Sequence, residues 1–117
     1  MSVAKARGTA FETAVVRYLR NWHPDAERRA MQGQLDKGDL FLPGEKRLAI
    51  ECKNQKAFSL AQWVEEAKVE ANNAGVPFGV VIHKRRLANV AESYATLPLY
   101  AFAHLMWGDP IENGDAR

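Results

Sequence analysis

Apolar residues recur at intervals of three and four along two long segments, which is the spacing of one face of an α-helix. Residues 9–22 form the first predicted helix, with the apolar positions Phe11, Val15, Tyr18, Leu19 and Trp22. Pro24 predicts its end, because proline disfavours helical geometry in the residue before it. Residues 59–75 form the second predicted helix, with the apolar positions Leu60, Trp63, Val64, Ala67, Ala71 and Ala74. This helix opens with a capping-box pattern, which favours a capping role for Gln62 over a functional one, and stops at Gly75.

Shorter apolar runs between turn residues predict five β-strands, at residues 28–32, 40–42, 48–53, 78–82 and 94–97. The run at 78–82 is nearly continuous, as expected for a strand buried on both faces. Pro43 and Gly44 suit the centre of a type II turn, which predicts a hairpin between the second and third strands. Residues 99–107 predict a short, very apolar final helix. The pattern therefore predicts an α/β fold of order α-β-β-β-α-β, a mixed sheet flanked by helices, with a last edge strand and a C-terminal helix.

The third predicted strand divides its side chains between two faces, because successive residues of a strand point in opposite directions. Leu48, Ile50 and Cys52 share one face, and Glu51 and Lys53 share the other. A surface salt bridge between Glu51 and Lys53 is the plain alternative to a functional pair. We favour function, because the apolar face shows that the strand is at least half buried, where charges are costly.

Asp39 lies at the start of the hairpin and can reach the same patch of the sheet as Glu51 and Lys53. The plain alternative for Asp39 is a turn acid beside Gly38. Two carboxylates and one ammonium together can hold a divalent cation and a water molecule beside a phosphate.

The set of Asp39 followed by Glu51-Cys52-Lys53 inside an apolar strand resembles the PD-(D/E)XK nuclease superfamily, with Gly38 where that pattern often has proline. Residues 7–12 resemble the start of the first helix in archaeal and phage-type Holliday junction resolvases. The segment 59–75 resembles the helix that follows the catalytic strand. The resemblance covers roughly residues 6–86 and implies a restriction-endonuclease-like core.

The resemblance also implies roles for particular residues. Catalysis is expected from Glu12, Asp39, Glu51 and Lys53, and the expected ligands of Mg²⁺, with Mn²⁺ as a substitute, are Asp39, Glu51 and Glu12. Lys53 is expected to orient the attacking water or to neutralise the phosphate. Glu12 has an alternative interpretation, because Thr9 to Glu12 is itself a capping-box pattern.

Basic residues are concentrated in the part of the chain that carries these acids. Residues 1–86 hold 15 Lys and Arg against 10 acids, whereas residues 87–117 hold one Arg against four acids. Such an asymmetry suits a polyanion-binding surface. The expected DNA contacts are Lys5, Arg7, Lys56, Lys84, Arg85 and Arg86. For the last three, which follow His83, a solvated basic loop is the alternative.

The bulk properties fit one compact domain over residues 1–117 with a loose polar tail at 111–117. The single cysteine, Cys52, cannot form an internal disulfide, so we expect a cytoplasmic protein. No apolar run approaches the roughly 20 residues of a membrane span. No other chemistry competes, because there is no zinc-type Cys/His cluster, phosphate-binding glycine loop or nucleophilic serine motif. With DNA as the expected partner, we expect no membrane and no small-molecule substrate.

The resulting expectation is a metal-dependent, structure-selective DNA endonuclease. A Holliday junction resolvase acting as a homodimer is favoured, because cutting two symmetry-related strands requires two sites. The apolar residues of the last helix either close the core or form the dimer surface. The alternatives are a restriction- or repair-type nuclease, and a non-catalytic DNA-binding module on a decayed nuclease fold. A decayed copy would usually have lost one of Asp39, Glu51 and Lys53, and all three are present.

Overall fold

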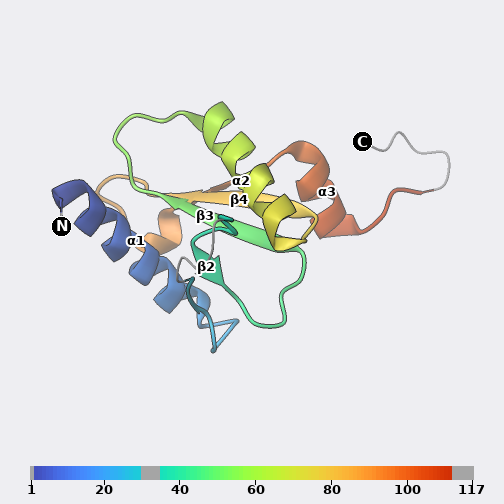
Figure 1. The fold of residues 1–117 in the computed structure, drawn as a ribbon, viewed down its shortest axis with the longest axis horizontal. Helices are drawn as coiled ribbons and strands as arrows, with labels where there is room; N and C mark the ends of the chain where they lie inside the picture. Colours follow the sequence, from blue (N-terminus) through green and yellow to red (C-terminus); the bar gives the residue numbers. More distant parts are fainter. Residues whose placement is uncertain (1, 30–34, 112–117) are drawn as a thin grey trace.

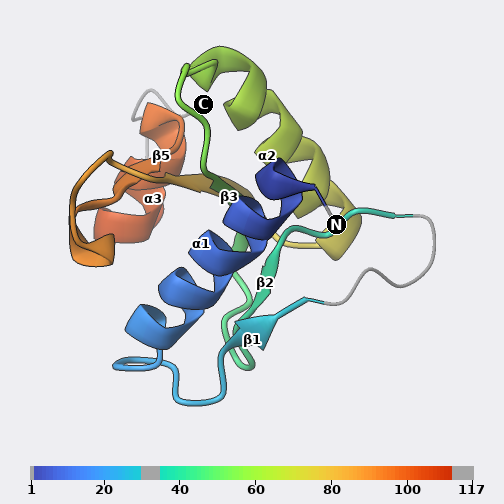
Figure 2. The ribbon, with the colours of Figure 1, turned by 90° about the vertical axis from the view of Figure 1, so that its left-hand side faces the viewer.

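The computed structural model describes residues 2–29 and 35–111. Its elements are α1 (Val3–Leu19), β1 (Glu27–Arg28), β2 (Leu40–Phe41), β3 (Leu48–Lys53), α2 (Leu60–Ala74), β4 (Phe78–His83), the 3₁₀ turn η1 (Val90–Glu92), β5 (Tyr94–Thr96) and α3 (Leu99–Trp107). Figure 1 shows α1 and α2 on opposite sides of the sheet, and the view turned by 90° in Figure 2 agrees. The predicted α/β class and the order of elements are confirmed.

The five strands form one mixed sheet in the order β1-β2-β3-β4-β5. The first three strands pair antiparallel, β3 and β4 pair parallel, and β5 pairs antiparallel with β4. A parallel neighbour requires a crossover connection, and α2 supplies it. The central strands β3 and β4 are aligned over their whole length, with Glu51 opposite Val81.

The hairpin between β2 and β3 has the predicted turn. Gly44 has a φ of +88°, and the N–H of Glu45 donates to the carbonyl of Leu42 over 3.0 Å. A positive φ at this third turn position is the mark of a type II turn and favours glycine. The turn fixes the pairing of Leu40 with Ile50, and thereby brings the residue before β2 alongside the middle of β3.

Each face of the sheet has its own apolar core. Beneath α1 the buried residues are Phe11, Val15, Val16, Ala26, Leu40, Leu42, Ile50, Cys52 and Val80. Beneath α2 the buried cluster is smaller and consists of Trp63, Ala67 and Val81. As predicted, β4 is apolar towards both helices, since its residues alternate between the two cores.

Gly79 allows α2 to lie close to the sheet. A Cβ atom at this position would overlap the carbonyl oxygen of Ala67 and lie 3.0 Å from the Ala67 side chain. Only glycine lets two backbones approach in this way. The close approach brings the sheet-facing side chains of α2 to the level of β3.

The first helix is longer at its start than its apolar spacing predicts. It begins at Val3, because the Ser2 hydroxyl accepts a hydrogen bond from the N–H of Lys5 over 3.1 Å and caps the helix. Lys5 and Arg7 therefore lie on α1 rather than before it. At the other end the helix stops at Leu19, so Trp22, an apolar position of the predicted helix, lies beyond it and is 64% exposed.

Two further boundaries differ from expectation. The first strand is Glu27–Arg28 rather than residues 28–32, and the positions 30–32 lie outside the described residues. The fourth strand continues to His83, which is only 2% exposed and packs among the rings of Phe58, Trp63 and Tyr94. His83 is thus separated from the exposed basic residues that follow it.

Within the part of the chain that the structure describes, no helix combines the length and apolarity that crossing a membrane requires. The tail expected at residues 111–117 falls outside the description except for Ile111, which is exposed.

Candidate active site

Asp39 and Glu51 meet at the start of the hairpin, as their spacing predicts. The N–H of Asp39 donates to the carbonyl of Ile50 over 2.8 Å, and its Oδ2 accepts from the N–H of Cys52 over 2.7 Å. These two bonds place the Asp39 carboxyl within hydrogen-bonding reach of the Glu51 carboxyl. Glu51 comes from the middle of β3 and is only 8% exposed.

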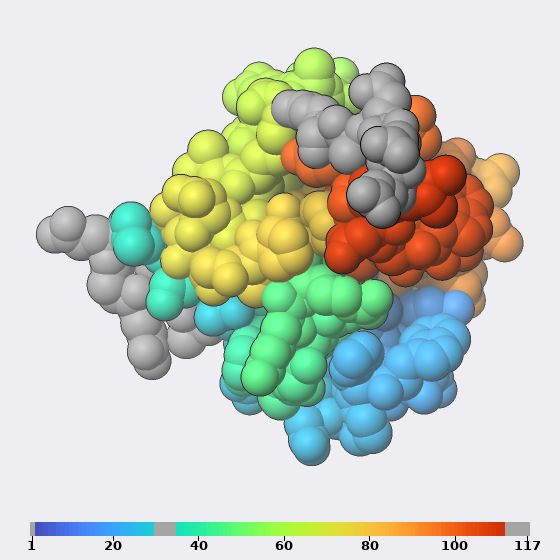
Figure 3. Space-filling model, turned by 90° about the vertical axis from the view of Figure 1, so that its right-hand side faces the viewer, coloured from blue at the N-terminus to red at the C-terminus, as the bar shows by residue number. Residues whose placement is uncertain are grey.

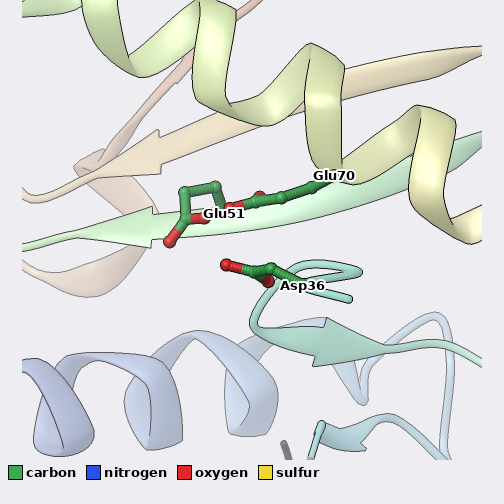
Figure 4. Close-up of side chains that lie close together, drawn as sticks. All are labelled: Asp36, Glu51 and Glu70. Atoms are coloured by element: carbon green, nitrogen blue, oxygen red, sulfur yellow. The ribbon is translucent and has the colours of Figure 1, made fainter. Parts of the chain in front are cut away.

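Two further acids join Glu51 from other elements. Asp36 belongs to the segment before β2, and Glu70 belongs to α2. One carboxylate oxygen from each of Asp36, Glu51 and Glu70 lies within 4.8 Å of the others. Figure 4 shows the three side chains pointing toward one another in the space between β3, α2 and the Asp36 segment.

The Asp36 segment is tied to the helix. The carbonyl of Asp36 accepts a hydrogen bond from Asn73 Nδ2 of α2 over 2.8 Å, and its Oδ1 accepts from the N–H of Gly38 over 2.9 Å. Asp36 itself is exposed, whereas Glu70 is only 4% exposed. The cluster therefore has a buried side at Glu70 and an open side at Asp36.

Burial, together with the neighbouring carboxyls, raises the pKa values of these acids. Burial raises the pKa of Asp39 to about 8, and the neighbouring Glu51 carboxyl adds to the rise. Burial also raises the pKa of Glu51 to about 8, with the Glu70 charge adding to it. The pKa of Glu70 rises to about 7, again mainly through burial, with Asp36 and Asp39 contributing. A cation at this place would relieve the same repulsion.

The chemistry of these acids fits a hard divalent cation. All side-chain ligands offered by the cluster are carboxylate oxygens, the type that Mg²⁺ and Mn²⁺ prefer. Glu70 Oε2 is buried and has no hydrogen-bond partner among the described residues. A buried polar atom without a partner is rare and needs a physical explanation, and a bound cation is one.

Lys53 lies two residues after Glu51 on the same face of β3. Its ammonium pairs with Glu66 of α2, with Nζ and Oε2 3.1 Å apart, and its side chain is 18% exposed. Burial acts to lower the pKa of Lys53, but the hydrogen bond to Glu66 and the charge of Glu51 outweigh it, so the pKa lies above its usual value. Lys53 is therefore a fixed positive charge beside the acids.

Glu12 lies at the margin of the cluster rather than in it. Its Oε1 accepts a hydrogen bond from Arg28 Nε over 3.1 Å. Burial raises the pKa of Glu12, and the charge of Asp39 contributes, so the two carboxylates are near each other. The capping interpretation is wrong, because α1 begins at Val3 and Glu12 lies well inside it.

The predicted basic residues separate into two sets. Arg7, Lys84 and Arg86 line one cleft of about 450 Å³, together with Asn54 and an apolar wall that includes Phe11. Lys5 and Lys56 are exposed outside this cleft, and Arg85 pairs with Glu92, with Nη1 and Oε2 3.7 Å apart.

The cleft lies against α1 at the end of β3. The N–H of Lys84 donates to the carbonyl of Lys53 over 3.0 Å, so the basic loop starts directly beside Lys53. Asn54, the next residue along the chain, donates from Nδ2 to the carbonyl of Arg7 over 3.4 Å. These two bonds hold Arg7, Asn54 and Lys84 together at the end of β3.

Sequence reasoning missed Asp36, Glu66 and Glu70. Glu70 had a signal, because it falls on the sheet-facing stripe of α2, seven residues after Trp63 and next to Ala71. An acid inside an apolar stripe marks a buried charge. Asp36 and Glu66 had no comparable signal. Gln62, in contrast, is exposed, and Ser59 makes no side-chain capping bond, so the expected capping box is not formed.

Comparisons of this chain with known family models, with curated proteins and with solved structures find no match. Any function is therefore inferred from the residues described above.

Proposed function

We propose that this protein is a Mg²⁺-dependent DNA endonuclease with a restriction-endonuclease-like core, resembling the PD-(D/E)XK superfamily. The observation that carries the proposal is the meeting of the half-buried Asp39 with the buried Glu51, with Lys53 fixed on the same strand face. Buried acids that repel one another are unfavourable for folding, and such arrangements concentrate at functional sites.

Asp39 and Glu51 are the residues that would hold the metal at the catalytic position. A bound Mg²⁺ lowers the pKa of a coordinated water and stabilises charge on the phosphate. Lys53 supplies a fixed positive charge to a phosphate oxygen or to the attacking water. Glu66 holds Lys53 before substrate arrives, and thereby limits the positions that its ammonium can take.

The cleft lined by Arg7, Lys84 and Arg86 would take the phosphates that flank the cut bond. Contacts between basic side chains and phosphates supply most of the sequence-independent affinity for nucleic acid. They also set its register on the protein. The N–H of Lys84, which lines this cleft, donates to the carbonyl of Lys53, so the flanking phosphates would lie near the end of β3.

Four-way DNA junctions are the substrate we propose, with a homodimer as the active form. The exposed face of α3 carries Leu99, Phe102, Met106 and Trp107, whose exposed fractions are 79%, 41%, 60% and 72%. Figure 3 shows the side chains of α3, in red, at the surface beside the segment leading into β4, in yellow. Monomers rarely expose a contiguous apolar patch of this kind, and a symmetric partner would cover it.

Sedimentation velocity at micromolar concentration tests this assembly. We expect a dimer, with and without junction DNA. A monomer under both conditions would contradict the dimer and the junction substrate, and would leave the Asp39–Glu51 site untouched.

Cleavage of labelled DNA tests the function. We expect the protein to cut a four-way junction in Mg²⁺ but not in EDTA, and to cut linear duplex and single strands more slowly. Asp39→Asn should lose cutting while it keeps its fold and its DNA binding. Asp25→Asn, at an exposed aspartate away from the cluster, is the matched control and should cut at the wild-type rate. Equal cutting by Asp39→Asn and wild type would contradict the assignment.

A further inference from the structure

Asp36, Glu51 and Glu70 form a second group of acids, which shares Glu51 with the pair of Asp39 and Glu51. Their oxygens come from a loop, a strand and a helix, and they lie within 4.8 Å of one another. None of the ion pairs found among residues 2–29 and 35–111 involves any of these three acids. The ammonium of Lys53 forms its ion pair with Glu66 rather than with any of these three acids.

Glu70 is the strongest sign that something else belongs there. Glu70 is 96% buried, because only 4% of its surface is exposed. Its Oε2 has no hydrogen-bond partner among the described residues. A long charged side chain on a helix usually reaches out to water. Glu70 instead points at Glu51 and Asp36 (Figure 4). Buried carboxylates are ordinarily paired with a cation or coordinate a metal.

The separations fit one shared ion. Two ligands on opposite sides of an ion with bonds of about 2.4 Å are about 4.8 Å apart. The three oxygens of Asp36, Glu51 and Glu70 lie within that limit of one another, so they are close enough to be ligands of one cation. Asp36 is the exposed member of the three, so the site is open to solvent on its side.

We propose that Asp36, Glu51 and Glu70 bind a second hard divalent cation, which shares Glu51 with the catalytic position and binds before any nucleic acid. Glu51 then bridges two cations, one toward Asp39 and the other toward α2. The part that this second cation would play in DNA cutting rests on the function proposed above. Its binding to the free protein does not.

Binding of Mn²⁺ to the whole chain without DNA tests the proposal. The probe is the electron paramagnetic resonance signal of free Mn²⁺ during a titration. Glu70→Gln and Asp36→Asn should each weaken one binding step by about 100-fold or more, a loss at least as large as that from altering an outer-shell partner. Asp39→Asn should keep that step. Glu65→Gln is the matched control, since Glu65 lies on the solvent side of the same helix and pairs with Lys68.

Thermal unfolding with and without Mn²⁺ supplies a second measurement. Mn²⁺ should raise the melting temperature of wild type, Glu65→Gln and Asp39→Asn, and should raise that of Glu70→Gln much less. Asp36→Asn changes an exposed residue and keeps the Oδ1 that accepts from Gly38, so this variant should keep the fold. Wild-type Mn²⁺ affinity and stoichiometry in both Glu70→Gln and Asp36→Asn would overturn the proposal.

The nuclease function and the second cation site fail separately. If Glu70→Gln loses a Mn²⁺ step but the wild type never cuts DNA, the second cation is supported and the nuclease is rejected. If the wild type cuts DNA and its Mn²⁺ binding needs Asp39 but neither Asp36 nor Glu70, the nuclease is supported and the second cation is rejected.

Discussion

The two faces of β3 are built from alternate residues of one six-residue strand, yet they have opposite physical roles. Toward α1 the strand presents Leu48, Ile50 and Cys52 to an apolar core. Toward α2 it presents Glu51 and Lys53 to other charged residues. The first face stabilises the fold by burying apolar surface. The second face costs stability, because it buries carboxylates whose raised pKa values show mutual repulsion and desolvation.

The difference between the two faces of β3 indicates which side of the sheet carries the candidate site. A strand that only had to fold would be apolar on both faces, as β4 is with Val80 toward α1 and Val81 toward α2. Its neighbour β3 departs from that pattern at Glu51 and Lys53. Residues that break a folding rule without local compensation are typical of functional sites.

The largest effect is expected on the apolar face. Ile50→Ala should lower the free energy of unfolding by about 2–5 kcal/mol, because it leaves a cavity beneath α1. Urea unfolding measures the loss. Val3→Ala, at a residue 75% exposed, is the control and should change stability little. A small loss for Ile50→Ala would mean that the α1 core is not the stabilising face.

The next effect concerns Lys53 and should appear in rate rather than stability. Lys53→Ala should lower the single-turnover cleavage rate by about 10²- to 10³-fold, as expected for a charge aimed at the transition state. DNA affinity should change much less. Lys68→Ala, at a lysine that pairs with Glu65 on α2, is the control and should leave the rate unchanged. If Lys53→Ala cut within a few-fold of wild type, Lys53 would serve only as the partner of Glu66.

Stability without divalent cations should depend on pH through the charged face. The pKa values of Asp39 and Glu51 are raised from 3.8 and 4.5 to about 8, and that of Glu70 from 4.5 to about 7. Between the ordinary pKa values of these acids and their raised values, the folded state binds more protons than the unfolded state. The free energy of unfolding therefore falls as the pH rises through this range. We expect urea unfolding in EDTA to show higher stability at pH 5 than at pH 8. The opposite slope would contradict the buried cluster.

Divalent cations should remove most of this pH dependence of stability. Mg²⁺ or Mn²⁺ binds the ionised acids, so it should restore stability at pH 8 and have little effect at pH 5. Replacing Glu65 with Gln should leave this response unchanged, because Glu65 lies on the solvent side of α2.

A smaller effect is expected from the basic cleft. Neutralising Arg7, Lys84 and Arg86 together should reduce the slope of log affinity against log salt by about 0.9 for each phosphate that the variant no longer neutralises. Its control is the triple variant Arg17→Ala, Lys46→Ala and Lys68→Ala, which removes the same charge from positions outside the cleft. Equal slopes for the two triple variants would mean that DNA takes another path, such as over Lys5 and Lys56.

Local signals in the sequence predicted much of this arrangement. The bounds of β3 and α3 match those expected, because alternation and a dense apolar run define them. The meeting of Asp39 with Glu51 followed from the Pro43–Gly44 turn and the two-residue period of a strand. The start of α1 was missed, since its first two turns contain no apolar stripe and depend on the Ser2 cap.

The rest of the site depends on contacts between distant segments. Asp36 and Glu66 reach the cluster through the approach of α2 to the sheet, which Gly79 permits. Neither the register of α2 on the sheet nor the path of the Asp36 segment has a periodic signal in the sequence. The grouping of Arg7 with Lys84 and Arg86 is likewise a product of tertiary packing.

The acids that face α2 are central to this account. They lower the stability of the fold, and in our proposal they bind cations. The most direct test is the free energy of unfolding of Glu51→Gln and wild type at pH 8 without divalent cations. Glutamine keeps the shape and removes the charge, so we predict that the variant is more stable than wild type by on the order of 1 kcal/mol. A variant less stable than wild type would contradict the account, because Glu51 would then be a structural residue of the sheet.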